Sequence, residues 1–312
     1  MTKTTINSFL KYVKNGEGIY MLLAKLGLKN KDPDEKYLSH LFQAHMGVHL
    51  NLDEPKTFNE KIQWLKIHDR KASYTKMVDK YEVKKYVSSI IGPSYIIPNY
   101  GVWDSFKEIQ FNNLPNQFVL KCTHDSNSVF ICNDKSKFNY KKIEEAINKR
   151  LKTNHFLRGR EWAYKDVKPR IIAEKLLIDP VRPVLTDYKI FCFDGVPQLI
   201  MTANGSRDDE SSLNRRMYDL DWNLMNIGLH GKDPLSNAEE KPVVLPQMLE
   251  ISRKLSKGIP LLRVDLYVIE TRIFFGELTF YHSCGFEEFV PNIWDSKLGE
   301  MIHLDLIKDD KV

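Results

Sequence analysis

The sequence predicts an α+β fold, on two observations. The first hundred residues read mostly as helix and loop, whereas the chain after Gln117 alternates short β-rich runs with single helical segments. With 312 residues, of which 42% are hydrophobic and 28% charged, the chain is long and apolar enough to bury an enzyme-sized core. We expect one globular unit, divided into a helical region over 1–94 and two β-rich subdomains over 95–173 and 174–312.

Helical signals dominate the first part of the chain. The stretch TFNEKIQWLKIHDR opens with Thr57 and Glu60 at capping-box spacing, which predicts the start of a helix. The stretch MVDKYEVKKYVSSII predicts a second helix, which ends at Gly92 and Pro93. IIPNYGVW should be extended, because Pro98 cannot lie inside a helix.

Strand signals fill most of the remainder. QFVLKC and SVFICN flank the polar turn THDSN, which predicts a hairpin, and YKKIEEAINKRLKTN follows as an amphipathic helix. Three further strands are predicted by RIIAEKLLI, DYKIFCFDG and VPQLIMTA. A polar stretch, NGSRDDESSLNRR, comes next, and PQMLEISRKLSKG predicts a helix. The last hairpin is RVDLYVIETRIFFGELTF, in which we expect a three-residue connection from Glu270 to Arg272.

The charge and hydropathy of the sequence indicate which kinds of ligand or partner the protein could bind. The net charge of +5 is spread without a dense Lys/Arg block, so we expect no nucleic-acid partner and consider anionic small ligands. No run approaches the roughly 18 apolar residues that span a bilayer, and the N-terminus lacks a signal-peptide core. The N-terminal segment could form a helix on a membrane surface, because its sequence, FLKYVKNGEGIYMLLAKLGL, is basic and amphipathic. Packing of this segment on the protein's own core is the favoured interpretation.

These features predict a cytoplasmic protein without a transmembrane segment, for which peripheral membrane contact stays open. The four cysteines occur singly, without a CxxC pair that would indicate zinc or redox chemistry. Free thiols in a reducing compartment are therefore expected.

The last hairpin contains two carboxylates among residues that otherwise look buried, which requires a physical explanation. The expected register places Asp265 opposite Glu277 and Arg263 opposite Thr279. Like charges opposite one another on one sheet face are destabilising, so a cation is expected between the two acids. Mg²⁺ suits them, because it binds through one or two carboxylates and the oxygens of a phosphate-bearing substrate. The alternative is an ordinary sheet surface in which Arg263 pairs with an acid.

Other polar residues fit a phosphate-bearing ligand. Lys121 ends the strand FVLKC before a turn that contains Ser126 and Ser128, and such turns gather hydroxyls and backbone amides around anions. Glu174 and Asp187 bracket a proline-containing turn, and their carboxylates suit ribose hydroxyls or an exocyclic amine. Solvated strand-end acids are the alternative for this second pair.

In this order, these stretches resemble the ATP-grasp superfamily, the fold of D-alanine:D-alanine ligase and related carboxylate-amine ligases. The similarity is greatest to the TupA-like branch, which is associated with teichuronopeptide and other bacterial surface-polysaccharide biosynthesis. It extends from TFNEKIQWLKIHDR to FVPNIWDSKLG. The resemblance implies an ATP-grasp fold whose two β-rich subdomains enclose ATP, with Mg²⁺ as the metal.

The resemblance also implies roles for residues that would contact the phosphates. Lys80, which follows Asp79, and Lys121 match the two phosphate-contacting lysines. HDSNSV, with Ser126 and Ser128, stands where the phosphate-covering loop lies, although the glycines of the ligase loop are missing.

The resemblance also implies which residues would contact the nucleoside. AEKLL matches the strand that contacts adenine: Glu174 leads it, and the backbone from Lys175 to Leu177 would read the base, while Asp187 stands near the ribose-binding acid.

RVDLY and GELTF match the metal-binding strands. Asp265 and Glu277 take the carboxylate positions, and Arg263 takes that of the arginine that stabilises the transition state. Thr279 replaces the asparagine ligand that the ligases commonly have.

The activity that the resemblance implies is phosphorylation of a carboxylate by ATP, followed by attack of an amine on the acyl phosphate. In this branch the carboxylate would be a uronic acid or an amino acid of a surface glycan such as capsule or O-antigen, carried on a nucleotide or a lipid. The βαβ substrate domain of typical members is not recognisable before Tyr95, so substrate-binding residues are not assigned.

Two other classes stay open. A glycosyltransferase would use the Asp219-x-Asp221 pair of YDLDW to hold a sugar nucleotide, and a non-catalytic protein would bind ATP without turnover. Three features have no assigned role: Lys189, which would reach a phosphate, His282, which would take a proton from the amine, and the loop over 205–216 with Arg207, Arg215 and Arg216.

Overall fold

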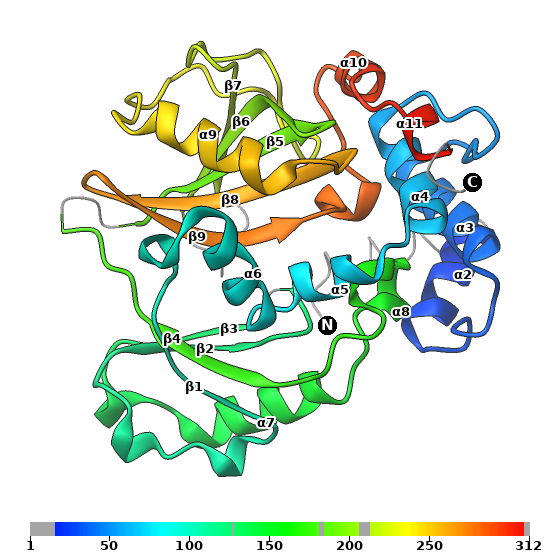
Figure 1. Ribbon diagram of the computed structural model, residues 1–312. Helices are drawn as coiled ribbons and strands as arrows, with labels where there is room; N and C mark the ends of the chain where they lie inside the picture. Colours follow the sequence, from blue (N-terminus) through cyan, green and yellow to red (C-terminus); the bar gives the residue numbers. More distant parts are fainter. Residues whose placement is uncertain (1–15, 127, 181–183, 206–212, 309–312) are drawn as a thin grey trace.

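The computed structural model describes residues 16–126, 128–180, 184–205 and 213–308. These residues form two antiparallel β-sheets with helices around them, which confirms the predicted α+β class (Figure 1). All four cysteines are free thiols, as expected. No helix in the described ranges is long and apolar enough to cross a membrane.

The N-terminal region is helical, as predicted. Its helices are α2 (Gly16–Lys25), α3 (Asp34–Met46), α4 (Phe58–His68), α5 (Ala72–Val78) and α6 (Glu82–Ile91). The predicted capping box starts α4: the hydroxyl of Thr57 accepts the backbone N–H of Glu60 at 3.2 Å, and the Glu60 carboxylate accepts the N–H of Thr57 at 3.0 Å.

The single helix predicted over MVDKYEVKKYVSSII is wrong, because the chain breaks into α5 and α6 at Asp79. The backbone of Asp79 is extended, and its carboxylate accepts the N–H of Tyr81 at 2.8 Å, which starts the next helix. The break leaves Lys80 between helices, where its N–H donates to the carbonyl of Thr123 at 3.1 Å. A lysine of the helical region is thereby fixed to the end of a strand.

The first sheet has four strands in the order β1-β4-β2-β3. They are β1 (Asn99–Trp103), β2 (Phe118–Cys122), β3 (Val129–Cys132) and β4 (Ile171–Lys175). The β2–β3 hairpin is confirmed, and α7 (Tyr140–Leu151) covers one face of the sheet through Ile147. The subdomain boundary expected at residue 173 falls inside β4, whereas the change of sheet comes in the connection that follows this strand.

The second sheet has five strands in the order β7-β6-β5-β8-β9. They are β5 (Asp187–Phe193), β6 (Val196–Asn204), β7 (Asn214–Tyr218), β8 (Leu261–Ile269) and β9 (Arg272–Thr279). The predicted helix α9 (Leu245–Ser256) buries Met248, Ile251 and Leu255 against one face of this sheet. Because side chains alternate along a strand, the other face carries the polar residues of these strands.

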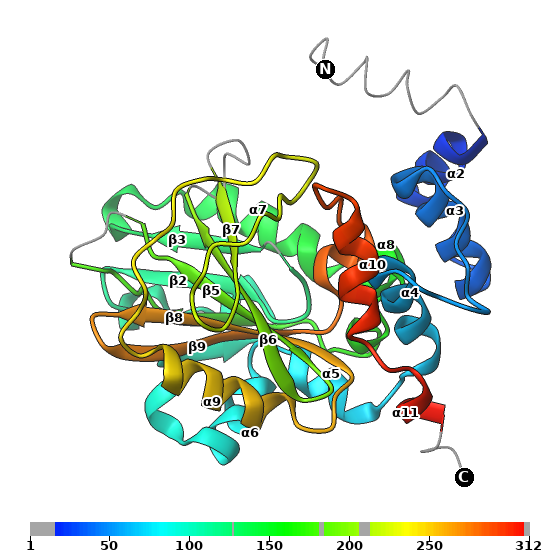
Figure 2. The same ribbon diagram turned by 90° about the horizontal axis from the view of Figure 1, so that it is seen from above.

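The remaining helices are short. They are α8 (Phe156–Gly159), α10 (Ile293–Glu300), α11 (Asp305–Lys308) and the 3₁₀ turns η1 (Pro93–Tyr95), η2 (Phe106–Glu108), η3 (Phe111–Asn113), η4 (Lys135–Lys137), η5 (Trp162–Tyr164) and η7 (His282–Gly285). Figure 2 shows α2, α3, α4, α10 and α11 gathered along one side of the two sheets. Lys61 of α4 holds α10 there, since its ammonium donates to the carbonyls of Gly299 and Ile302, each at 2.8 Å.

The β8–β9 hairpin has the register that the sequence predicts at its polar end. Asp265 pairs with Glu277, and Arg263 pairs with Thr279. Residues two apart on a strand share a face, so these four side chains lie on one face of the five-stranded sheet.

The predicted three-residue connection is wrong, although the register is right. Ile269 pairs with Arg272, which leaves a loop of only residues 270–271. The register then shifts by one residue between Asp265 and Leu266, and the extra residue on β9 is Gly276. This bulge compensates for the shorter loop and restores the pairing of the two acids.

A methyl group at Gly276 should disturb the bulge. A Cβ there would lie 3.0 Å from the carbonyl oxygen of Asp265 and 3.1 Å from the ring of Tyr267. We therefore expect Gly276→Ala to lower the free energy of unfolding by about 1–3 kcal/mol, measured by urea denaturation. Gly16→Ala is the matched control, because its methyl group would meet nothing within 4 Å. Equal stability of Gly276→Ala and the parent protein would contradict the steric argument.

Candidate functional site

A cavity of about 280 Å³ lies between the two sheets, lined by strands of both and by α6. Seven of the side chains predicted from the sequence line it: Lys80, Lys121, Ser126, Glu174, Asp187, Arg263 and Glu277. Figure 1 shows the two sheets one above the other, with α6 beside them. Residues far apart in the chain are thus brought into one cavity, which we call the intersheet cavity.

The four-stranded sheet contributes a buried carboxylate between two lysines. Glu174 on β4 is 4% exposed, and its oxygens lie 2.5 Å from the ammonium of Lys121 on β2 and 2.5 Å from that of Lys84 on α6. Burial alone would raise the pKa of Glu174, but the two ammonium groups lower it to about 2. Glu174 therefore stays charged and holds both lysines at the cavity.

Lys84 is a cavity residue that the sequence analysis did not identify. It also donates to the carbonyl of Ile97 at 2.9 Å, and burial lowers its pKa despite the adjacent Glu174. The signal available in the sequence was its position four residues after Lys80 in a helical stretch.

The depressed pKa of Glu174 predicts a pH-dependent contribution to stability. Since the folded-state pKa lies near 2, below the ordinary value of 4.5, this contribution is present above about pH 4.5 and is lost as the pH falls toward 2. We expect Glu174→Gln to lower the free energy of unfolding by up to about 3 kcal/mol at pH 7, and the difference to shrink below pH 4.5. Urea denaturation of both proteins between pH 7 and 3 measures this, and a difference that stays constant over this range would refute it.

The turn after β2 carries the other predicted phosphate-contacting groups. The ammonium of Lys80 donates to the carbonyl of Asp125. Ser126 lines the cavity, whereas Ser128 is 1% exposed, donates to the Asp125 carboxylate and accepts the N–H of Cys122 at 3.1 Å. Ser128 thus braces the turn, and Ser126 is the serine placed to meet a ligand. Asn127, in the same predicted loop, lies outside the described residues.

The five-stranded sheet presents a row of charged side chains, one lysine followed by two carboxylates. Lys189 on β5 pairs in register with Asp265 on β8, which pairs with Glu277 on β9. The Lys189 ammonium lies 2.5 Å from an oxygen of Asp265 and 2.5 Å from one of Asp187. Lys189 is therefore held by two carboxylates at the cavity wall.

Arg263 has the most fully bonded side chain of the site. Its Nε and Nη2 donate to the two oxygens of Asp265 at 2.7 and 2.8 Å, a bidentate pair. Nη2 also lies 3.0 Å from the hydroxyl of Thr279 and 3.4 Å from Glu277. Burial would lower the pKa of Arg263, but Asp265 raises it above its usual value, so the guanidinium keeps its charge beside the cavity.

His282 completes the support of Arg263. Nη1 of Arg263 lies 2.7 Å from Nδ1 of His282, and an arginine can only donate, so this nitrogen accepts and the imidazole is neutral. Burial lowers the pKa of His282, in agreement with the neutral form. The other nitrogen, Nε2, carries the proton and lies 3.1 Å from the buried carboxylate of Glu287. Nδ1 of His282 is thus engaged by Arg263, and Nε2 by Glu287.

Two carboxylates are the candidate donors for a metal ion. Among the described residues, no group of three or more His, Cys, Asp or Glu side chains could hold a metal ion. Asp265 and Glu277 nevertheless face each other across β8 and β9, and one guanidinium, that of Arg263, contacts both. Two carboxylates of this kind fit Mg²⁺ when a substrate phosphate supplies further oxygens.

Some predicted residues lie away from the lining of the intersheet cavity. Lys175 is exposed, and its N–H already donates to the carbonyl of Pro98 at 2.9 Å; Leu177 is half-buried. Arg215 lines the cavity, but Arg216 pairs with Glu239 at 2.9 Å instead. Arg207 lies outside the described residues.

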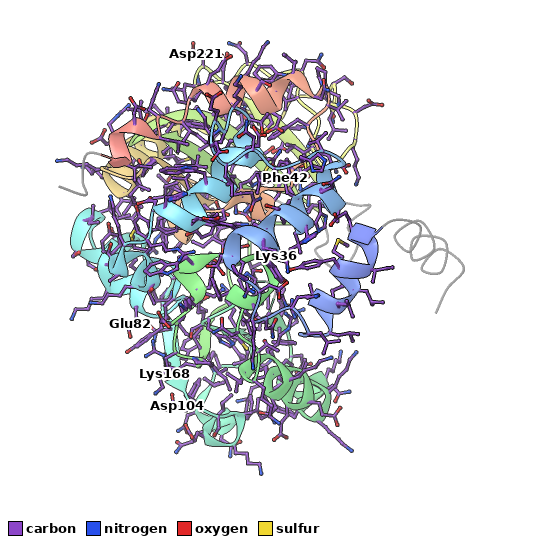
Figure 3. The ribbon with its side chains drawn as sticks, turned by 90° about the vertical axis from the view of Figure 1, so that its right-hand side faces the viewer. Lys36, Phe42, Glu82, Asp104, Lys168 and Asp221 are labelled. Carbon is purple, nitrogen blue, oxygen red and sulfur yellow. The ribbon has the colours of Figure 1, made fainter. Side chains whose placement is uncertain are left out.

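The Asp219-x-Asp221 pair forms a local turn. One oxygen of Asp219 accepts the N–H groups of Asp221 at 3.0 Å and Asn223 at 2.8 Å. In Figure 3, Asp221 lies at the outer rim of the molecule, at the opposite end from Asp104 of the four-stranded-sheet part. Neither acid of the pair is among the residues that line the intersheet cavity.

Comparison with solved structures gives distant similarities. D-alanine–D-alanine ligase from Bacillus anthracis complexed with ATP is 16% identical, with 80% of this chain and 70% of that chain covered and a TM-score of 0.42. The ATP-grasp ligase PsnB complexed with minimal precursor, Mg and ADP is 10% identical, with 71% and 57% covered and a TM-score of 0.37. Phosphoribosylamine–glycine ligase from Thermotoga maritima is 12% identical, with 66% and 48% covered and a TM-score of 0.39. The chain spans only about half the length of the last two.

The family comparison is more informative. No curated protein matches the chain. The family model described as TupA-like ATPgrasp matches residues 60–303, which include both sheets and every side chain of the intersheet cavity. The chain therefore belongs to the TupA-like ATP-grasp family.

Proposed function

We propose that this protein is an ATP-dependent carboxylate-amine ligase that acts through an acyl phosphate. The observation that carries the proposal is the intersheet cavity, whose lining combines Lys80 and Lys84 of the helical region and Lys121 of β2 with Arg263 and Glu277 of the other sheet. Family membership adds the expectation that this cavity holds ATP.

The first group of cavity residues would bind ATP. Lys80, Lys84 and Lys121 supply positive charge for the phosphates of ATP. Tyr267 and Phe275 supply aromatic surface for the base. Glu174 and Asp187 offer carboxylate oxygens to the amine of the base or to the ribose.

The second group acts on the transferred phosphoryl group. Asp265 and Glu277 would hold Mg²⁺, with Thr279 beside them, and the bound ion supplies charge neutralisation to the phosphate oxygens. Arg263, fixed by Asp265 and His282, presents a guanidinium that stabilises developing negative charge on the acyl group. The bonds to Asp265 and His282 fix the direction of this guanidinium before a substrate binds.

The proposed chemistry has two steps. A carboxylate oxygen of the first substrate attacks the γ-phosphorus of ATP, and ADP leaves with the electrons of the broken P–O bond. The amine nitrogen of the second substrate then attacks the acyl carbon, inorganic phosphate leaves, and the nitrogen loses one proton to solvent or a base. The products are an amide, ADP and phosphate.

We further propose that the carboxylate is a uronic acid or an amino acid of a bacterial surface polysaccharide such as capsule or O-antigen, carried on a nucleotide or a lipid.

Product analysis with purified protein tests the proposal. The protein is given Mg-ATP, a panel of amino acids and amines, and nucleotide-linked uronic acids, and ADP release is followed. We expect release that depends on a carboxylate, with hydroxylamine trapping the acyl phosphate as a hydroxamate. ATP binding without ADP release would indicate a non-catalytic binding protein. Release of a nucleoside diphosphate from a sugar nucleotide without ATP would indicate a glycosyltransferase, and failure to bind ATP would refute the proposal.

A further inference from the structure

A second cavity lies outside the intersheet cavity, between the N-terminal helices and the segment that follows α7. Its volume is about 540 Å³, and it shares no lining residue with the intersheet cavity. Its walls are α2, the turn after it, α3 and residues 152–158. Figure 2 shows α2 and α3 at the side of the molecule, away from the sheet strands. We call it the basic cavity.

The basic cavity has an apolar floor and a polar rim. Met21, Ala24, Tyr37 and Leu41 of the two helices are buried beneath it. The Tyr37 hydroxyl donates to the carbonyl of Leu157 at 2.9 Å, which fixes α3 to the opposite wall. The cavity is therefore a built feature in which the two walls are bonded to each other.

The described lining contains no carboxylate, and apart from the phenol of Tyr37 its ionisable side chains are basic: Lys25, His45, Lys152 and Arg158. Within the described ranges, Lys25, Lys152 and Arg158 form no ion pair or side-chain hydrogen bond. These three side chains are exposed at the rim of the cavity, so they are accessible to an anionic ligand.

Three acids of the N-terminal helices and of the turn between them are already held by other groups. Asp32 accepts the hydroxyl of Tyr20 at 2.8 Å and lies 3.6 Å from Lys36, a residue that Figure 3 shows on α3. Asp34 pairs with Arg70 at 2.7 Å and with Arg160 at 3.2 Å.

Glu17 at the start of α2 is also held, 2.7 Å from His40. The pKa of His45 gives an independent sign of the local potential: burial lowers it, and the charges of Lys25 and Lys66 lower it further. Both charges that act on His45 are therefore positive.

We propose that the basic cavity binds an amphiphilic anion. A phosphate or carboxylate group would be held by Lys25, Lys152 and Arg158, and an apolar or sugar portion would lie against the floor formed by Met21 and Leu41. This binding function is separate from the ligase chemistry and does not depend on it.

The test is a calorimetric titration of the full chain with dodecyl phosphate below its critical micelle concentration, and separately with glucose 1-phosphate. The test variant is Lys152→Gln/Arg158→Gln. The control is Lys142→Gln/Lys149→Gln, which removes the same charge from exposed positions of α7 that do not line the cavity. We expect the test variant to weaken binding by about tenfold or more and the control by less than about twofold.

The two ligands distinguish the source of the anion. Variant-sensitive binding of dodecyl phosphate assigns the site to a lipid-like acid, and the same result with glucose 1-phosphate alone assigns it to a sugar phosphate. Equal affinity for uncharged dodecyl maltoside, equal weakening in both variants, or binding of neither anion would overturn the proposal. Binding only to anionic phospholipid vesicles would overturn it in favour of a membrane-docking surface.

Discussion

Asp265→Asn is expected to lower ligase activity by about 100-fold or more and to destabilise the fold by about 3–5 kcal/mol. Asp265 is 1% exposed and accepts two bonds from Arg263 and one contact from Lys189. Asparagine has almost the same shape but no charge, and it turns a donor group toward these two cations. The cost arises because Arg263 and Lys189 then lose a shared counter-charge in a buried place.

Activity would fall for a second reason, since one of the two carboxylates proposed to hold Mg²⁺ loses its charge. Steady-state ADP release gives the rate, and urea denaturation gives the stability. Asp221→Asn is the control, because Asp221 lies at the outer rim in Figure 3 and should leave both quantities unchanged. A fully active Asp265→Asn protein together with an inactive Asp221→Asn protein would remove the hairpin from the mechanism.

Arg263→Lys should lower kcat by about 10²–10³-fold while the KM for ATP changes by less than about threefold. Lysine keeps the positive charge but cannot form the bidentate pair with Asp265 and the bond to Nδ1 of His282 at the same time. The positive charge would remain in the cavity, but the side chain that carries it would no longer be held in one orientation. Because we propose that Arg263 acts on the acyl group in the transition state, the loss should appear in kcat.

Arg272→Lys is the matched control on the same hairpin. Its guanidinium lies over the ring of Phe274 near the loop end of β9, away from the acids. Thermal melting of both variants separates a misfolded protein from an inactive one. An Arg263→Lys protein that is well folded and within about threefold of full activity would show that Arg263 has only a structural role.

Local sequence patterns were sufficient for most of the fold. The capping residues Thr57 and Glu60 located the start of α4, and runs of β-branched and aromatic residues located most strands of both sheets. The strand β7 was missed, because Asn214–Tyr218 begins inside a stretch that looks like a polar connection. These signals succeed because hydrogen-bond capping and side-chain alternation depend on neighbours in the chain. The break at Asp79 was missed, since its carboxylate acts as a cap inside a pattern that otherwise continues as helix.

The register of the last hairpin is an instructive case. The sequence predicted that Asp265 faces Glu277, which the structure confirms, but with a loop one residue too long. A bulge at Gly276 restores the register, and a bulge depends on cross-strand packing that a turn signature does not contain.

The sequence by itself determined the α+β class, most of the elements and seven of the residues that line the intersheet cavity, because each of these depends on local patterns and on their order. Only the tertiary structure decided that Lys84 of α6 shares Glu174 with Lys121. It also decided that the unprotonated Nδ1 of His282 accepts a hydrogen bond from Arg263. Such contacts join elements far apart in the chain, and burial there fixes which groups are charged, so neither could be derived from neighbours in the sequence.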